Sequence, residues 1–286
     1  MRSDTMQKAA GRKENKVLDV AKYLILGSYT IAILFPLYFL VVSSLKNDNE
    51  IFLNPFGLPK NFLWENYREV FINFKLFINM LNSLYYAFFG VLLVVIVGVL
   101  ASYAIVRMRW KLSNKVFALL MTGMLVPMHS VILPLYLSVR RAGITSPRIV
   151  LALIFAAFAL PRTIFILSGF LKDLPRTIEE AAVIDGASLI RIVVSIVIPM
   201  LKPAIATICI FNFLTIWNDL LIGLVFITKD IDKTLQLGIL KFKGDYVTMY
   251  NYVITAILIA IAPTITVYLI FQKRIISGIT AGAVKG

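Results

Sequence analysis

Charged residues are scarce in this chain of 286 residues. Asp, Glu, Lys and Arg make up 15% of the sequence, whereas hydrophobic residues make up 59% and the mean hydropathy is +0.86. A soluble globular domain carries about 25% charged and about 45–50% apolar residues. The composition therefore excludes a soluble enzyme and a disordered regulator, and it favours a protein that crosses a membrane several times.

Cysteine and histidine occur once each, as Cys209 and His129. A single cysteine cannot form a disulfide within the chain, and a single histidine excludes a multi-histidine metal site. The sequence also lacks the G-x4-G-K-[ST] phosphate loop and the H-E-x-x-H motif. We therefore expect no metal site, no cofactor bound by this chain and no enzymatic activity of its own.

Acidic residues are also few, because 15 Asp and Glu stand against 29 Lys and Arg, for a formal net charge of +14. An excess of basic residues can indicate a nucleic-acid partner. In a membrane protein the same excess is first explained by cytoplasmic loops rich in Lys and Arg. We therefore predict no nucleic-acid partner.

Stretches without charged residues predict the membrane spans, because about 20 apolar residues cross a bilayer once. Four stretches enclose 23, 31, 24 and 27 uncharged residues, and two further apolar segments are each interrupted by one charge, Arg162 or Asp219. The predicted spans lie between Lys22 and Lys46, Lys75 and Arg107, Lys115 and Arg140, Ile149 and Leu171, Pro203 and Ile227, and Asp245 and Lys273. The expected fold class is all-α, a polytopic membrane protein with six transmembrane helices.

The distribution of Lys and Arg predicts the orientation of these spans. With the N-terminus in the cytoplasm, the cytoplasmic segments hold 17 of these residues and the outer loops hold 11. This bias predicts that both termini face the cytoplasm. The first apolar stretch is longer than the core of a signal peptide and no small-residue cleavage site follows it, so we expect it to remain as a span.

Polar residues within the predicted spans have alternative interpretations, because such residues are costly in a membrane. Arg162 follows Pro161, where it either lines a transport pathway or anchors the proline kink. His129 is either a hydrogen-bond partner between helices or a proton relay. Seven prolines inside predicted helices favour helices that bend around a pathway. These are Pro36, Pro127, Pro134, Pro161, Pro199, Pro203 and Pro263.

Asn212, Trp217, Asn218 and Asp219 form a second polar cluster in the fifth span. The Trp ring could stack on a sugar whose hydroxyls bind the amide and carboxylate groups, or it could anchor the chain at the membrane interface. These four residues are the candidate substrate pathway. Together with Arg162 and His129, Asp219 also defines the alternative function, an ion- or proton-coupled secondary carrier.

A segment between the fourth and fifth spans combines helix signals with small side chains. Pro175 suits the start of a short helix and Gly186 suits its exit. Between them, Glu179–Ala182 supplies acidic residues for the first turns and two alanines that let another backbone approach closely. Glu180 offers a carboxylate to a basic partner.

The spacing in this segment resembles the EAA motif, E-A-A-x3-G-x9-I-x-L-P, of the permease subunits of ATP-binding-cassette (ABC) importers. Glu180–Ala182 is followed after three residues by Gly186 and after nine more by Ile196–Pro199, in which Ile198 replaces the customary Leu. The resemblance extends over residues 17–286 to the carbohydrate-uptake branch that includes the smaller permease subunit of the maltose transporter. It is carried by residues 54–62, Asn82-Ser83-Leu84, Pro127, Pro134, Trp217-Asn218 and residues 278–286.

This resemblance implies the type I ABC importer permease fold for residues 17–286, after a cytoplasmic segment of residues 1–16. It implies an outer loop at residues 46–75, a cytoplasmic coupling-helix loop at 172–198 and a cytoplasmic tail at 275–286. The loop from Lys229 to Tyr250 is similar to the one that contacts the binding protein in this branch. The implied location is the cytoplasmic (inner) membrane of a bacterium or archaeon, as a multi-pass protein.

The implied function is ATP-driven import of carbohydrate, with oligosaccharide favoured, by alternating access. The implied partners are a second permease subunit, an ABC ATPase dimer that binds the ATP and Mg, and an extracytoplasmic sugar-binding protein. The residues implied to couple to the ATPase are Glu179, Glu180, Ala181, Ala182, Asp185 and Gly186, with Glu180 facing a basic residue of the partner. The tail residues implied to contact the ATPase are Ala281, Gly282, Val284 and Lys285.

Overall fold

A computed structural model describes residues 2–108, 110–244 and 248–283, with side chains described between residues 18 and 272 of these ranges. The regular secondary structure of the described residues is helical, and one isolated β-bridge joins Lys243 to Thr248. The chain divides into two compact units, one of Met1–Val70 with Phe242–Leu258 and the other of Phe71–Lys241 with Ile259–Gly286. The all-α prediction is confirmed.

The first unit contains α1 (Arg2–Ser43), α2 (Asp48–Leu53), α3 (Glu65–Arg68) and the start of α14 (Tyr250–Ala283). Within α1, Leu18–Ser43 is long and apolar enough to cross a membrane. After α1 the chain folds around Lys46, whose buried ammonium group donates hydrogen bonds to the carbonyl oxygens of Asn54 and Gly57, both at 2.7 Å. These bonds satisfy a charge that would otherwise be costly to bury, and they order the start of the predicted outer loop.

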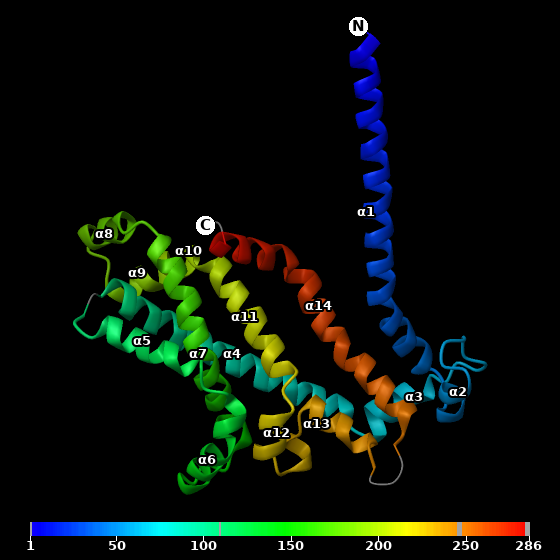
Figure 1. Cartoon of the computed structure of the whole chain (residues 1–286). Coiled ribbons are helices and arrows are strands. Elements are labelled where there is room, and N and C mark those ends of the chain that lie inside the picture. Colours follow the sequence, from blue (N-terminus) through cyan, green and yellow to red (C-terminus); the bar gives the residue numbers. More distant parts are fainter. Residues whose placement is uncertain (1, 109, 245–247, 284–286) are drawn as a thin grey trace. The chain divides into compact units, whose positions relative to one another are not determined.

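The second unit is built on three long helices, α4 (Leu76–Arg107), α7 (Pro147–Asp173) and α11 (Lys202–Trp217), which pack against one another (Figure 1). The apolar side chains that they bury form two clusters along the unit. At Gly98 of α4, a Cβ atom would lie only 2.6 Å from Cγ2 of Thr163 in α7. The close packing of α4 on α7 therefore requires a residue without a side chain at this position.

The third predicted span is broken rather than continuous. It consists of α5 (Ser113–Gly123) and α6 (Met128–Arg141), which are bent by 102° relative to each other. Pro127 lies between them with an extended backbone (φ −65°, ψ 124°). Because proline lacks an N–H group and disfavours a helical residue before it, the helix stops short of this residue and restarts after it.

The fifth predicted span also differs from its expected bounds. Its helix α11 ends at Trp217, and a separate short helix α12 (Leu221–Phe226) follows. The carboxylate of Asp219 accepts the backbone N–H groups of Ile222 and Gly223, at 3.4 and 3.0 Å. These bonds cap the start of α12, so the polar residue that interrupts the apolar run also divides the helix.

Three short pieces precede α11, namely α9 (Leu189–Ile192), the π-helical turn η2 (Val193–Val197) and α10 (Ile198–Met200). The segment Leu189–Met200 is bent by 76° relative to α11. Pro199 and Pro203 lie at the first positions of α10 and α11, and Pro127 lies just before α6, so these three are at helix starts rather than in helix interiors. The other four predicted interior prolines, Pro36, Pro134, Pro161 and Pro263, lie inside helices.

Four helices of the described chain are long and apolar enough to cross a membrane, and the number reaches six if each bent pair forms one span. Six spans are therefore compatible with the structure, with the third and fifth in broken form, and the fifth then consists of Leu189–Met200 and Lys202–Trp217 rather than the predicted stretch from Pro203 to Ile227. The remaining elements are the π-helical turn η1 (Glu69–Asn73), α8 (Thr177–Ile184), η3 (Asp230–Asp232), α13 (Leu235–Ile239) and η4 (Leu240–Phe242).

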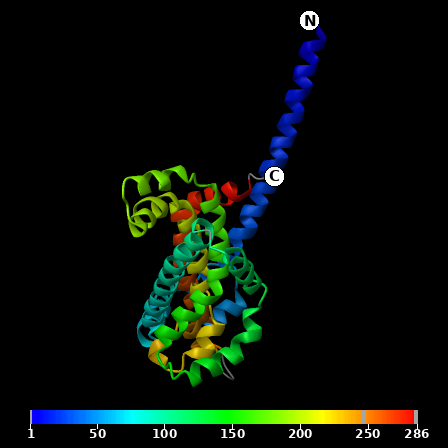
Figure 2. The same cartoon turned by 90° about the vertical axis from the view of Figure 1, so that its left-hand side faces the viewer.

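Within the second unit, the short elements gather at two opposite ends. Helices α8 and α10 lie at one end, together with the C-terminal end of α14, while α6, α12 and α13 lie at the other (Figure 1). The view turned by 90° shows the same separation (Figure 2). The segment with the EAA spacing and the end of the last long helix thus share one end of this unit.

Candidate functional site

The predicted helix of the EAA segment is present as α8, and it begins at Thr177 rather than at Pro175. At its predicted exit, Gly186 has a left-handed backbone, with φ +77°. The N–H of Gly186 binds the carbonyl oxygen of Val183 at 3.0 Å, and the N–H of Ala187 binds that of Ala182 at 2.9 Å. These two bonds form a Schellman motif, which fixes the end of α8 and the direction of the chain beyond it.

One face of α8 and the turn after it are exposed. Glu180, Ala181 and Asp185 are exposed, and Ala182 is half-buried. Apolar side chains surround them, and the most exposed is Ile184, with 86% of its surface accessible. The others are Ile178, Val183, Leu189 and Ile190. Apolar side chains that gather on an exposed loop are typical of a surface that another protein covers.

Glu179 does not share this exposed face. Only 13% of its side chain is exposed, and Oε1 lies 2.8 Å from Nε of Arg107 on α4, whose side chain is 5% exposed. The hydroxyl of Tyr103 donates a hydrogen bond to Oε2 of Glu179 at 3.0 Å. The structure therefore separates the two glutamates that the sequence analysis grouped together, because Glu179 binds within the chain and only Glu180 faces outward.

Two further arginine contacts join α4 to the chain around Pro175. Nη2 of Arg107 donates to the carbonyl oxygen of Leu174 at 2.9 Å, and Nη2 of Arg176 donates to that of Val106 at 3.1 Å. Sequence reasoning missed the roles of Tyr103, Arg107 and Arg176. The available signal was weak, because a basic residue at the end of a span is ordinarily explained by its reach toward water.

The predicted substrate-pathway residues do not all come together. Trp217 is fully buried, its indole N–H donates to the carbonyl oxygen of Ala260 at 3.1 Å, and its ring stacks on Phe213. It is therefore neither an interfacial anchor nor free to stack on a sugar in this structure. Asn218 is exposed and its amide donates to the carbonyl oxygen of Leu214.

Asn212 and Asp219 do share a cavity of about 260 Å³, together with Arg162 and Thr215. Its apolar lining comes from α6, α7, α11, α12 and the residue after α5, and consists of Met124, Met128, Phe155, Phe158, Ala159, Ile216 and Ile222. Nη2 of Arg162 donates to the Oδ1 atom of Asn212 at 3.0 Å. His129 is exposed and does not line this cavity, so the structure does not assemble the three residues of the secondary-carrier alternative.

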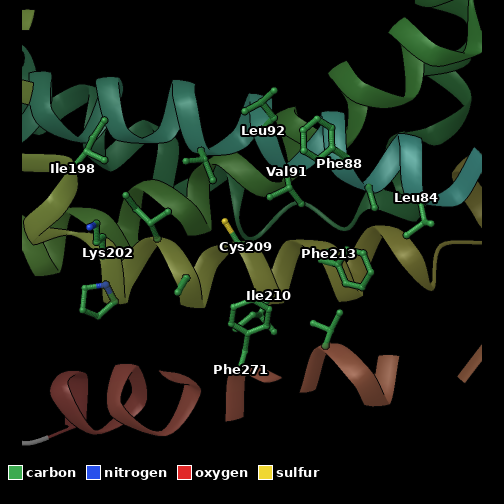
Figure 3. Close-up of a pocket in the computed structure, with 16 residues that line it drawn as sticks. Leu84, Phe88, Val91, Leu92, Ile198, Lys202, Cys209, Ile210, Phe213 and Phe271 are labelled. Atoms are coloured by element: carbon green, nitrogen blue, oxygen red, sulfur yellow. The ribbon is translucent and has the colours of Figure 1, made fainter. Parts of the chain in front are cut away.

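A larger cavity of about 1010 Å³ lies between α4, α11 and the second-unit part of α14 (Figure 3). Its lining is almost wholly apolar, and Phe88, Phe213 and Phe271 point into it with several aliphatic side chains. Lys202 and Cys209 supply the few polar atoms. A sugar needs several hydrogen-bond partners for its hydroxyl groups, so this lining is unsuited to a carbohydrate.

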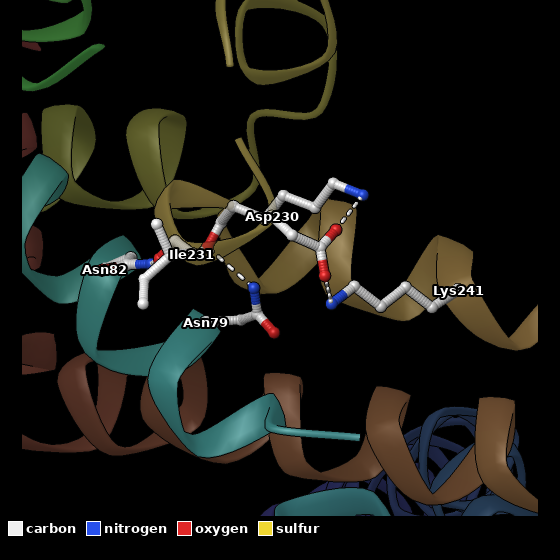
Figure 4. Close-up of polar contacts among 6 residues, drawn as sticks. Asn79, Asn82, Asp230, Ile231 and Lys241 are labelled. Carbon is white, nitrogen blue, oxygen red and sulfur yellow. Dashed lines mark hydrogen bonds and ion pairs between the residues drawn. The ribbon is translucent and has the colours of Figure 1, made fainter. Parts of the chain in front are cut away.

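At the other end of α4, four polar side chains hold the segment around η3, and Figure 4 shows two of them, Asn79 and Asn82. The amides of Asn79 and Asn82 donate to the carbonyl oxygens of Lys233 and Ile231, at 2.9 and 2.7 Å. The hydroxyl of Tyr86 donates to the backbone carbonyl oxygen of Asp232, and the hydroxyl of Ser83 accepts a hydrogen bond from the N–H of Leu235. We call Asn79, Asn82, Ser83 and Tyr86 the outer clasp. They recur at the spacing of one helix face, so a single face of α4 holds the start of the predicted binding-protein loop.

The predicted tail lies at the limit of the described chain. The backbone of α14 includes Ala281 and Gly282, whose surroundings are not described, and Val284 and Lys285 lie outside the described residues. Among the described residues, no group of three or more His, Cys, Asp and Glu side chains could hold a metal ion.

Comparisons with known proteins identify the family of this chain. Residues 94–280, which include α8, Arg107 and the cavity of Asn212, match the family described as binding-protein-dependent transport system inner membrane component. The melibiose/raffinose/stachyose import permease protein MelC of Bacillus subtilis is 32% identical over 280 residues, covering 98% of this chain and 100% of MelC. The multiple sugar-binding transport system permease protein MsmG of Streptococcus mutans is 33% identical, covering 96% of this chain and 100% of MsmG.

A solved structure has the same fold. It is a bacterial ABC transporter involved in the import of the acidic polysaccharide alginate, with a TM-score of 0.79, 23% identity, and coverage of 91% of this chain and 97% of that one. MelC and MsmG are transport permease proteins, and this chain is likewise a transport component rather than an enzyme. The chain belongs to the family of binding-protein-dependent transport system inner membrane components and has the type I ABC importer permease fold.

Proposed function

We propose that this permease subunit imports a carbohydrate, in the oligosaccharide class, with energy from a separate ATPase. The observation that carries the proposal is α8, a helix with an exposed surface of small and apolar residues in the segment that has the EAA spacing. The names of MelC and MsmG, which refer to melibiose, raffinose, stachyose and multiple sugars, support the substrate class. The chain has no phosphate loop, so the ATP and Mg belong to a partner.

The ATPase subunit is proposed to bind the exposed face of α8. Ala181 lets the partner backbone approach closely, Ile184 and Ile190 supply apolar contact, and Glu180 supplies a carboxylate for a basic residue. Asp185 adds a second carboxylate and Gly186 fixes the turn. Glu179 is excluded from this contact surface because its carboxylate already binds Tyr103 and Arg107.

The proposed location is the cytoplasmic membrane of a bacterium or archaeon, with both termini and α8 on the cytoplasmic side. The common position of α8 and the C-terminal end of α14 within the second unit supports this assignment (Figures 1 and 2). The tail that includes Ala281, Gly282, Val284 and Lys285 would then extend toward the ATPase dimer.

The remaining partners are a second permease subunit and an extracytoplasmic sugar-binding protein. Each of the four single helices that are long and apolar enough to cross a membrane has less than half of its most apolar 18 residues buried within the chain. Much of the surface of these helices is therefore left for lipid and for a second permease. The loop from Lys229 to Tyr250, whose first part is held by the outer clasp, is proposed to bind the sugar-binding protein.

The cavity with Arg162, Asn212, Thr215 and Asp219 is proposed to form part of the sugar pathway. Its polar groups can bind sugar hydroxyls, and Phe155 and Phe158 supply apolar surface. Its volume of about 260 Å³ is slightly below the range of about 300–1,000 Å³ that is typical of small-molecule sites, so the second permease would complete it.

The experiment is uptake of radiolabelled raffinose into vesicles that contain the complete complex, with the binding protein outside and ATP inside. Import that requires internal ATP and persists with a protonophore supports the proposal. Import that stops with the protonophore while ATP remains would favour the secondary carrier. A change of Glu180 to Lys should abolish uptake but leave membrane insertion intact.

A further inference from the structure

Two side chains near the C-terminal end of α4 contact the two oxygen atoms of the Glu179 carboxylate. Oε1 of Glu179 lies 2.8 Å from Nε of Arg107, and Oε2 accepts a hydrogen bond from the hydroxyl of Tyr103 at 3.0 Å. Tyr103 and Arg107 are four residues apart and so lie on one face of α4. Because two residues of one helix hold the same carboxylate, the position of α8 depends directly on the position of α4.

Arginine contacts on both sides of Pro175 reinforce this attachment. Arg107 also binds the carbonyl oxygen of Leu174, and Arg176 binds that of Val106 in the last turn of α4. A cation is favourable there because a helix C-terminus carries partial negative charge. We call Tyr103, Arg107, Arg176 and Glu179 the inner clamp.

The burial of the charged pair indicates a role in orientation more than in net stability. A buried ion pair loses so much hydration that apolar residues of similar size often stabilise a protein equally well. Removing one partner is different, because the other charge is then left buried without compensation. The pair of Arg107 and Glu179 therefore disfavours arrangements in which α8 moves away from α4.

The same helix also carries the outer clasp. Asn79 and Tyr86 lie near one end of α4 and Tyr103 and Arg107 near the other, and no proline interrupts the helix between them. A continuous helix of 32 residues is about 48 Å long. A displacement of α8 can thus reach the segment around η3 through one element held by polar contacts at both ends.

On the basis of the proposed function, we propose that Arg107 and Glu179 are positioning residues for transport. They hold α8 on α4, so that an ATPase that moves α8 also moves α4 and the outer clasp. They bind neither ATP nor sugar. Their loss should therefore reduce the amount of sugar imported per ATP hydrolysed, while the surface that binds the ATPase remains.

The test uses the complete complex in vesicles with the binding protein, labelled raffinose and ATP. Glu179→Gln and Arg107→Gln should each lower sugar imported per ATP by about tenfold, within the 5–150-fold range typical of coupling between sites. The ATPase should still co-purify with both variants. The double variant Arg107→Glu with Glu179→Arg should regain at least part of the wild-type amount of sugar imported per ATP, because it restores a pair of opposite charges.

Arg191→Gln is the matched control, because it removes an exposed charge from the same cytoplasmic segment and should leave the ratio unchanged. Tyr103→Phe removes only one hydroxyl, and it provides a test if the charge variants do not fold. It should lower the ratio by a smaller factor. A wild-type ratio in Tyr103→Phe and in the folded charge variants would overturn the inner clamp, and so would loss of ATPase co-purification. Failure of the wild-type complex to import sugar would instead contradict the proposed function.

Discussion

Glu179 and Glu180 are neighbours in the sequence but face in different directions. Glu179 is largely buried against Arg107, whereas Glu180 is exposed beside Ala181 on the surface of α8. Successive helix residues are turned by about 100°, since one turn takes 3.6 residues, so adjacent carboxylates can serve different partners. In this chain one glutamate fixes the helix within the permease and the other is available to another subunit.

Charge reversal at the exposed glutamate should act on partner binding alone. We expect Glu180→Lys to abolish import and to reduce co-purification of the ATPase, because a like charge would face its basic residue. Insertion and thermal stability should change little, since a surface substitution usually changes stability by no more than about 0.5 kcal/mol. Glu65→Lys, an equal change at an exposed residue of α3, is the control and should retain import. Normal import by Glu180→Lys would contradict the assigned role of α8.

The exit of α8 should tolerate no ordinary side chain without a cost. Gly186 has φ +77°, and a Cβ atom added to it would meet no other atom within 4 Å, so the cost of Gly186→Ala is conformational, at about 1–2 kcal/mol. Gly186→Pro should abolish import, because proline cannot adopt this φ and removes the N–H that binds Val183.

Gly143 provides a matched control for this prediction. It has φ +70° and is equally open, but it lies after α6 rather than after α8. Gly143→Ala should lower the melting temperature about as much as Gly186→Ala, whereas import per folded complex should fall only for Gly186→Ala. Equal import by the two variants would show that the turn at Gly186 has no role beyond stability.

The sequence was sufficient for the helical class, for the existence of α8 and for its exit at Gly186. Each depends on local signals, namely apolar run length, cap residues and glycine position. The break at Pro127 was less visible, because a proline in a membrane span can either kink the helix or end it. The end of α11 at Trp217 was also hard to predict. The carboxylate of Asp219 caps the next helix, and the length of an apolar run does not reveal such a cap.

In the candidate sites, too, the sequence predicted what depends on local signals but not what depends on packing. The outward position of Glu180 was implied by the resemblance to the EAA motif, but the contact of Glu179 with Arg107 depends on how α4 packs beside α8. Trp217 was a reasonable candidate for stacking on a sugar, since its neighbours are polar. Its burial depends on how α11 packs against other elements, such as α14, where the carbonyl oxygen of Ala260 accepts the indole N–H, and one sequence does not encode that packing in any local pattern.

Mutations should distinguish the polar residues that line the proposed sugar cavity from Trp217, which is buried and has a structural role. Thr215→Ala and Asp219→Asn change polar groups that line the cavity and should raise the KM for sugar import by severalfold, since a lost hydrogen bond costs about 0.5–1.5 kcal/mol. Trp217→Phe should lower the melting temperature, because the carbonyl oxygen of Ala260 loses its donor, but it should leave KM unchanged. A higher KM in Trp217→Phe alone would reverse these assignments.

Because Asp230 pairs with two lysines, the loop beyond α12 should lose stability only within a narrow range of acidic pH. The ammonium groups of Lys233 and Lys241, at 2.7 and 2.8 Å, lower the pKa of Asp230 from 3.8 to about 2. Because the folded pKa is the lower one, this stabilisation is fully present above pH 3.8 and is lost as the pH falls toward 2. Asp230 is 70% exposed, so its contribution should not exceed about 1 kcal/mol.

The measurement is the difference in melting temperature between the wild-type complex and Asp230→Asn at several pH values. The difference should be small and constant from pH 8 to pH 5, because Asp230 stays ionised in both the folded and the unfolded chain over this range. It should decrease only below about pH 4, where the unfolded carboxylate begins to bind protons before the folded one does. A difference that already decreases between pH 7 and pH 5 would contradict the lowered pKa, and with it the pairing of Asp230 with the two lysines.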